Sequence, residues 1–105
     1  MREIRLLGAV FEDMAQATRW YDVEGSIELG DRFTAVFYSY LTHIQQHEKA
    51  YSVVYKEFRR VLLKPFPYSL YYRNYEDWIV VALVIHAARS PRSWQALLRG
   101  RGADL

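Results

Sequence analysis

The stretch Arg59–Arg73, which reads RRVLLKPFPYSLYYR, decides the fold of this chain. Two short apolar runs, RRVLL and PYSLYYR, flank the junction Lys64–Pro67. Each run is too short for a stable helix, and its β-branched and aromatic residues favour extended backbone. The two prolines of the junction disfavour helix and remove backbone donors. The stretch therefore predicts two strands joined by a short connection.

Strands are predicted on both sides of this stretch. A third run of the same kind, Trp78–Ile85 (WIVVALVI), follows the polar hinge Asn74–Asp77. Three consecutive strands with short connections indicate an antiparallel meander. Near the start of the chain, Glu3–Leu7 predicts a short first strand that ends at Gly8. The expected sheet is small and mostly antiparallel.

Two amphipathic helices are expected between the first strand and the meander. The first spans Ala9–Asp22, with an apolar stripe at intervals of three and four residues: Val10, Met14, Ala17 and Tyr21. The second begins at Ser26, which suits an N-cap, and ends near His47. Its stripe is formed by Leu29, Phe33, Val36, Phe37, Tyr40 and Ile44. A short link predicts a helical hairpin, and its stripes need one face of the sheet as a partner.

The end of the chain predicts only a little more structure. Pro91 precedes a short helical turn around Trp94–Leu98, with Trp94 as a hydrophobic cover for the sheet edge. Arg99–Leu105 (RGRGADL) is expected to be frayed. The predicted fold is α+β in the order β-α-α-β-β-β, with a helical hairpin packed on the sheet and a short C-terminal helical turn. Residues 1–105 are expected to form a single domain.

Composition narrows the class of protein. The chain has 105 residues and no cysteine, which excludes a disulfide scaffold and a cysteine-ligated zinc site. No apolar run approaches the length of a membrane span, and the N-terminus has no signal-peptide core of normal length. We therefore expect a cytoplasmic protein with no membrane partner.

The net charge of +2 conceals an uneven distribution along the chain. Residues 1–48 carry four Lys/Arg and eight Asp/Glu, whereas residues 49–105 carry ten and four. The cations therefore lie with the predicted sheet and tail. A basic half can attract nucleic acid or an acidic protein, or it can serve solubility alone.

Alternation along the strands divides the arginines and tyrosines between two faces. Arg59 and Arg60 must point to opposite faces, so one of them points away from the helices or lies at a strand end. In the next strand Tyr68, Leu70 and Tyr72 share a face opposite Ser69, Tyr71 and Arg73. Two interpretations stay open: a face of arginine and tyrosine suited to phosphates and stacked bases, or a solvated face with packed tyrosine rings.

Histidines offer two further candidate sites. His86 ends the last strand close to Arg89 and Arg92, and it could act as a general acid or base or hold a turn by hydrogen bonding. His43 and His47 have the i, i+4 spacing of a metal pair. No acidic third ligand is suitably spaced, so a solvated helix face is favoured, and neither a metal nor a cofactor is expected. A nucleophile elbow, a Gly-rich phosphate loop and a carboxylate dyad are absent from the sequence.

Several motifs occur together in a recognisable order. They are Trp20-Tyr21, Leu29–Phe33 (LGDRF), Val54-Tyr55, Arg60–Leu63 (RVLL), Phe66–Arg73 (FPYSLYYR), His86, Arg89–Pro91 (RSP) and Trp94. With these motifs the chain resembles the RelE/ParE superfamily of toxins from type II toxin–antitoxin systems, specifically its ParE-like, plasmid-stabilisation branch. The likeness covers nearly the whole chain. Ser90 departs from it, because the family more often has Asp between the Arg and the Pro.

The resemblance implies a toxin held in a hetero-oligomer by a cognate antitoxin, whose flexible segment wraps over the helices and sheet. ParE-like members inhibit DNA gyrase, whereas RelE-like members cleave mRNA on the ribosome. For the RelE-like site, Arg60, His86 and Arg89 are the nearest matches, but the additional strand lysines and the terminal catalytic tyrosine are missing. The expected function is gyrase inhibition; the alternatives are an mRNA endonuclease or an inactive antitoxin-binding module.

The resemblance and the charge pattern together predict which residues bind the antitoxin or the target. They are Arg59, Arg60, Tyr71, Arg73, Arg89 and Arg92.

Overall fold

The protein was analysed as a computed structural model that describes residues 2–102. Its elements are β1 (Glu3–Leu6), α1 (Gly8–Glu24), α2 (Ile27–Gln46), β2 (Val53–Tyr55), β3 (Phe58–Leu62), β4 (Tyr68–Asn74), β5 (Trp78–His86) and α3 (Pro91–Gly100). Within these residues five strands form a sheet in the order β1-β5-β4-β3-β2. β1 runs parallel to β5, and the other neighbours are antiparallel. The predicted α+β fold and mostly antiparallel sheet are confirmed.

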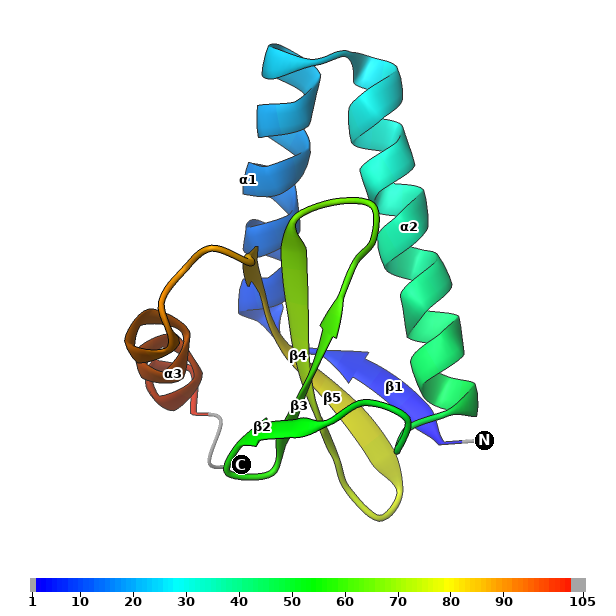
Figure 1. The fold of residues 1–105 in the computed structure, drawn as a ribbon. Helices are drawn as coiled ribbons and strands as arrows, with labels where there is room; N and C mark the ends of the chain where they lie inside the picture. Colours follow the sequence, from blue (N-terminus) through cyan, green and yellow to red (C-terminus); the bar gives the residue numbers. More distant parts are fainter. Residues whose placement is uncertain (1, 103–105) are drawn as a thin grey trace.

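Helices cover both faces of this sheet. The α1–α2 hairpin packs on one face, and α3 lies across the other (Figure 1). Beneath the hairpin the core contains both predicted helical stripes and side chains from the sheet, among them Phe33, Phe37, Ile44, Leu70 and Tyr72. A second, smaller cluster beneath α3 contains Phe58, Tyr71, Leu83, Trp94 and Leu98. The sheet therefore lies between two apolar layers.

Local sequence explains where the helices begin. Ser26 caps α2, because its Oγ accepts a hydrogen bond from the Leu29 amide at 3.1 Å, as predicted. Ser90 caps α3 in the same way, with Pro91 in the first turn. Gly30 lets the two helices of the hairpin approach closely, since a Cβ there would lie 1.8 Å from Oδ1 of Asp22. The hairpin thus depends on a small residue at its crossing.

Two elements differ from the sequence-based expectation. β2 was not predicted; it has three residues, and its pairing with β3 is irregular. The C-terminal helix has ten residues rather than a single short turn. Trp94 does not cover the sheet edge, because it stacks on Tyr71 of the central strand β4, with ring centroids 4.7 Å apart. The expected open face of the sheet is therefore largely covered by α3.

The C-terminal segment is also more firmly attached than expected. Arg99 and Gly100 belong to α3, and the Arg101 guanidinium makes a bidentate ion pair with Asp13 of α1, with distances of 2.6 and 2.7 Å. Asp13 also accepts a hydrogen bond from the Val84 amide, and Arg101 donates to the Ala82 carbonyl. The prediction of a frayed tail is therefore wrong for 99–102, while 103–105 lie outside the described residues.

The described part of the chain has no helix that is long and apolar enough to cross a membrane.

Candidate functional site

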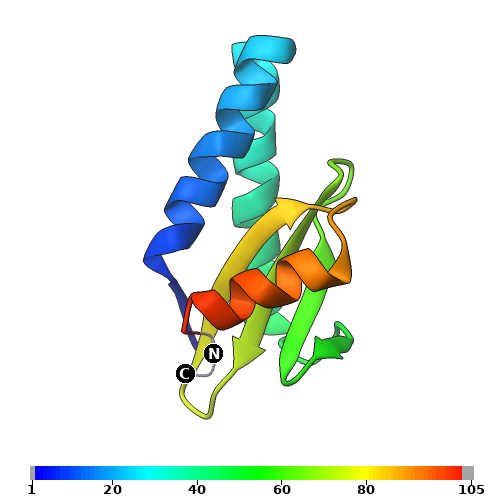
Figure 2. The same ribbon diagram turned by 90° about the vertical axis from the view of Figure 1, so that its left-hand side faces the viewer.

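A group of exposed cations lies on the α3 side of the sheet. Arg60 of β3 points to this side, because it pairs with Tyr71, whose ring lies beneath Trp94. Figure 2 shows α3 crossing this face, with β2 beyond it at the edge of the sheet. We call the exposed cations of this region the basic surface; they are Lys56, Arg60, Arg92 and Arg99.

Tyr55 lies beside two cations of the basic surface, Arg99 and Lys56. Nη1 of Arg99 donates a hydrogen bond of 3.1 Å to its hydroxyl, and Nζ of Lys56 lies 5.5 Å from its ring centroid. The hydrogen bond from Arg99, together with the charge of Lys56, holds the pKa of Tyr55 below its ordinary value. The field at this hydroxyl is positive, so an anionic group of a partner would be attracted to it.

Tyr71 supports the basic surface from below instead of contacting a partner. It is 1% exposed and stacks against Trp94. Burial raises the pKa of Tyr71, and a hydrogen bond from Arg60 acts in the opposite direction. Arg60 is thus held over the tyrosine hydroxyl while its own side chain stays exposed. Of the residues predicted to bind a partner, Tyr71 is the one that the structure buries.

Arg59 and Arg73 are occupied by contacts within the chain. On the hairpin side of the sheet, Arg59 donates to the Tyr51 carbonyl at 2.6 Å and so anchors the segment that follows α2. Arg73 pairs with Glu57 at 2.5 Å and lies over the ring of Tyr75. These two arginines stabilise the edges of the fold and present little free charge.

His86 and Arg89 lie at a different place, in a cleft of about 580 Å³ between α1, β5 and α3. Nδ1 of His86 accepts a hydrogen bond of 3.0 Å from the Ala88 amide, and its ring packs against Tyr68. Arg89 donates to Oγ of Ser93. Both residues therefore hold the turn between β5 and α3 while they line the cleft.

The structure does not bring together the three residues predicted to be catalytic. Cross-strand neighbours share a face of a sheet. His86 pairs with Tyr68, which packs into the core beneath the hairpin, whereas Arg60 pairs with Tyr71, which packs beneath α3. Arg60 and His86 therefore point to opposite faces of the sheet.

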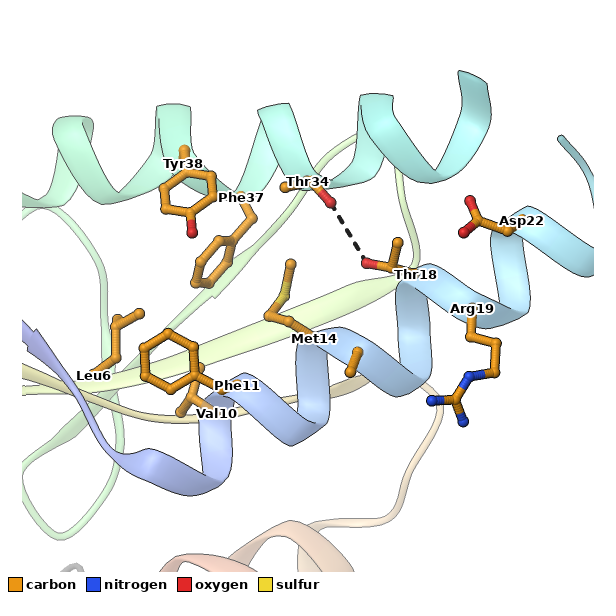
Figure 3. Close-up of a pocket in the computed structure, with 11 residues that line it drawn as sticks. Leu6, Val10, Phe11, Met14, Thr18, Arg19, Asp22, Thr34, Phe37 and Tyr38 are labelled. Carbon is orange, nitrogen blue, oxygen red and sulfur yellow. Dashed lines mark hydrogen bonds between the residues drawn. The ribbon is translucent and has the colours of Figure 1, made fainter. Parts of the chain in front are cut away.

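An apolar surface on the hairpin forms a second candidate site. A groove of about 400 Å³ runs between α1 and α2, and we call it the hairpin groove. It is lined mainly by Leu6, Val10, Phe11, Met14, Phe37 and Tyr38. Figure 3 shows these side chains at one end, with Arg19 and Asp22 at the other and the Thr18 and Thr34 hydroxyls between them. Oδ1 of Asp22 is buried without a hydrogen-bond partner.

The rim of the hairpin groove is apolar and open to solvent. Phe11 is 60% exposed and Tyr38 is 54% exposed. Further along the hairpin, Trp20, Val23 and Ile27 are also exposed, so five of the seven large exposed apolar side chains in 2–102 belong to α1 and α2. Phe11 and Tyr38 line the hairpin groove, whereas Trp20 and Val23 line a separate hollow near the tip of the hairpin.

Sequence patterns do not mark several residues of both sites. Tyr55 belongs only to the Val54-Tyr55 motif, no pattern marks Lys56, and Arg99 lies in the segment that the sequence predicts to be frayed. No periodicity marks these residues, because they meet only when β2 and α3 converge. The exposed aromatic residues of the hairpin carried a signal that could have been used, since Phe11 and Tyr38 lie outside the apolar stripes of their helices.

Comparisons with known proteins give matches in both sequence and structure, although no model of a protein family matches the chain. Toxin ParE2 from Mycobacterium tuberculosis strains CDC 1551 / Oshkosh and H37Rv is 28% identical over 101 residues, which are 95% of this chain and 95% of the relative. A solved structure of a chromosomal ParDE TA system from P. aeruginosa matches with a TM-score of 0.72 and 18% identity. It covers 82% of this chain and 96% of that one. At this identity the structural match shows a shared fold.

Proposed function

We infer that this chain, which belongs to the RelE/ParE superfamily, is the toxin of a type II toxin–antitoxin pair and acts as ParE-like toxins do, on DNA gyrase. The exposed apolar hairpin is the observation that carries the proposal. A toxin of this kind is held in a complex by its antitoxin. The chain has an exposed apolar surface of the type that such a complex would cover.

The hairpin groove is the surface that we assign to the antitoxin. Its rim aromatics offer the large, well-shaped contacts that dominate binding energy at protein interfaces. The basic surface lies on the opposite side of the sheet, so an antitoxin segment long enough to wrap the chain would bury apolar area at the groove and meet cations at α3. Raising the salt concentration should weaken only the second contribution.

Phe11→Glu is expected to weaken the complex with the antitoxin by about 30-fold or more, because it places a charge in the centre of the apolar rim. The measurement is calorimetric titration of the purified toxin with its purified cognate antitoxin. Ala35→Glu is the matched control, since it adds the same charge at an exposed position of α2 outside the groove. Equal losses for both variants would count against the groove as the antitoxin site.

The separation of Arg60 from His86 favours gyrase over mRNA as the target. Purified toxin is expected to inhibit gyrase supercoiling at micromolar concentration and to leave in-vitro translation unaffected. Arg60→Glu should reduce that inhibition about tenfold or more, because it reverses a charge at the centre of the basic surface. His86→Gln is the comparison variant and should retain inhibition, since His86 lies on the other face.

The other outcomes of these two assays identify the alternatives. Translation arrest that is lost in Arg60→Ala and in His86→Ala would replace the proposal with a ribosome-dependent mRNA endonuclease. Activity in neither assay, together with tight antitoxin binding, would mean an inactive antitoxin-binding module.

A further inference from the structure

Two histidines at the carboxyl end of α2 lie side by side, far from the basic surface and the hairpin groove. His43 belongs to the last turn of the helix, and His47 is its C-cap residue. Their ring centroids are 4.7 Å apart, with the planes tilted by 40°. Both side chains are exposed. The i, i+4 spacing of the two histidines by itself favoured a solvated helix face. The structure adds a contact between His43 and a third side chain.

That contact is made by Tyr51. Its hydroxyl lies 3.0 Å from Nδ1 of His43, so Nε2 is the ring nitrogen that remains free. The Tyr51 hydroxyl can accept a hydrogen bond as well as donate one. Imidazoles that bind a metal almost always donate their other N–H to an oxygen in this way. Tyr51 therefore restrains the His43 ring and leaves Nε2 available for a metal ion.

We propose that His43 and His47 bind a divalent transition-metal ion of the zinc class, with Tyr51 as a positioning residue. Zinc–nitrogen bonds of ~2.0–2.1 Å place two imidazoles on one ion with ring centroids about 5 Å apart, close to the separation found here. The negative end of the α2 dipole also favours a cation at this place. Imidazole suits zinc and nickel, whereas magnesium prefers oxygen ligands.

The side chains around His43 and His47 limit the kind of metal site that can form here. The described residues contain no group of three or more His, Asp and Glu side chains that could hold a metal ion. Water, or a donor from a bound molecule, completes the coordination, as in sites that keep open positions. Lys64 lines the same hollow as His43 and Tyr51 and repels a cation. The site is therefore an open, two-imidazole chelate rather than a closed structural centre.

The test is a Zn²⁺ titration of the full chain, free of any histidine tag, against a competing chromophoric chelator at neutral pH. Wild-type protein should bind one equivalent of Zn²⁺, and a parallel Mg²⁺ titration by calorimetry should show no binding. His43→Asn and His47→Asn should each weaken Zn²⁺ binding about tenfold or more, and Tyr51→Phe should weaken it about tenfold by freeing the His43 ring. His86→Asn is the matched control and should bind as wild type does.

Thermal melting of each variant without metal separates misfolding from loss of a ligand. The proposal is overturned if wild-type protein shows no saturable binding, or if either His43→Asn or His47→Asn binds as tightly as His86→Asn. Retention of full affinity in Tyr51→Phe would remove the positioning role and leave the two-imidazole site. None of these readouts depends on toxin activity, so the result stands apart from the gyrase assay.

Discussion

Trp94→Ala is expected to lower the free energy of unfolding by about 3–5 kcal/mol, because it removes a large buried ring from the cluster beneath α3. Trp94 is 4% exposed, stacks on Tyr71 and meets Tyr55 edge-on. A loss of this size is a large part of the stability of a small domain. Urea denaturation followed by circular dichroism measures the change, and amide hydrogen exchange shows whether α3 opens first.

Trp20→Ala provides the control, since it removes the same side chain from a position that is 56% exposed. Its cost is expected to stay within about 1 kcal/mol. If the two variants were equally stable, the packing of α3 on the sheet would not be a main source of stability. If amide protection in α3 were unchanged in Trp94→Ala, the helix would be held mainly by its C-terminal ion pair.

Arg101→Met is expected to cost about 3 kcal/mol, at the lower end of the range for breaking a buried ion pair. The side chains of Arg101 and Asp13 are 18% and 11% exposed. The substitution leaves the Asp13 carboxylate poorly solvated, with the Val84 amide as its remaining described donor. Denaturation at neutral pH measures the loss.

The double variant Asp13→Asn/Arg101→Met tests the pairing itself. It should lose less stability than the two single variants added together, because neither charge is then left without its partner. Arg5→Met is the matched control, because the ion pair of Arg5 with Glu3 is exposed. This variant also removes the cation–π contact of Arg5 with Trp78. The free energy of unfolding should fall by no more than about 1 kcal/mol. Simple additivity in the double variant would argue against a coupled pair.

Both predictions concern the attachment of α3, and this attachment also bears on function. Arg92 and Arg99 belong to α3, whereas Lys56 and Arg60 belong to the sheet side of the same surface. Release of the helix would separate these cations, so Trp94→Ala should weaken any interaction that needs the whole basic surface. The stability of the C-terminal helix and its proposed role in binding therefore depend on the same contacts.

Features that depend on neighbouring residues were predictable from the sequence. The apolar stripes of α1 and α2, the Ser26 cap and the three strands of the meander follow from local spacing, capping chemistry and β-branched or aromatic content. Alternation also required Arg59 and Arg60 to point to opposite faces. The ordered motifs carried the resemblance to the RelE/ParE superfamily, and Toxin ParE2 is similar to the chain at 28% identity.

Features that depend on long-range packing were decided only by the tertiary structure. The sequence could not tell which face would receive Arg60 and which His86, because that assignment follows from strand register and from the position of α3. It could not show that Tyr71 is buried, since Trp94 lies 23 residues further along the chain. The pairing of Asp13 with Arg101 spans 88 residues and leaves no periodic trace. Local chemistry determined the elements; the contacts between distant elements determined which side chains remain free to act.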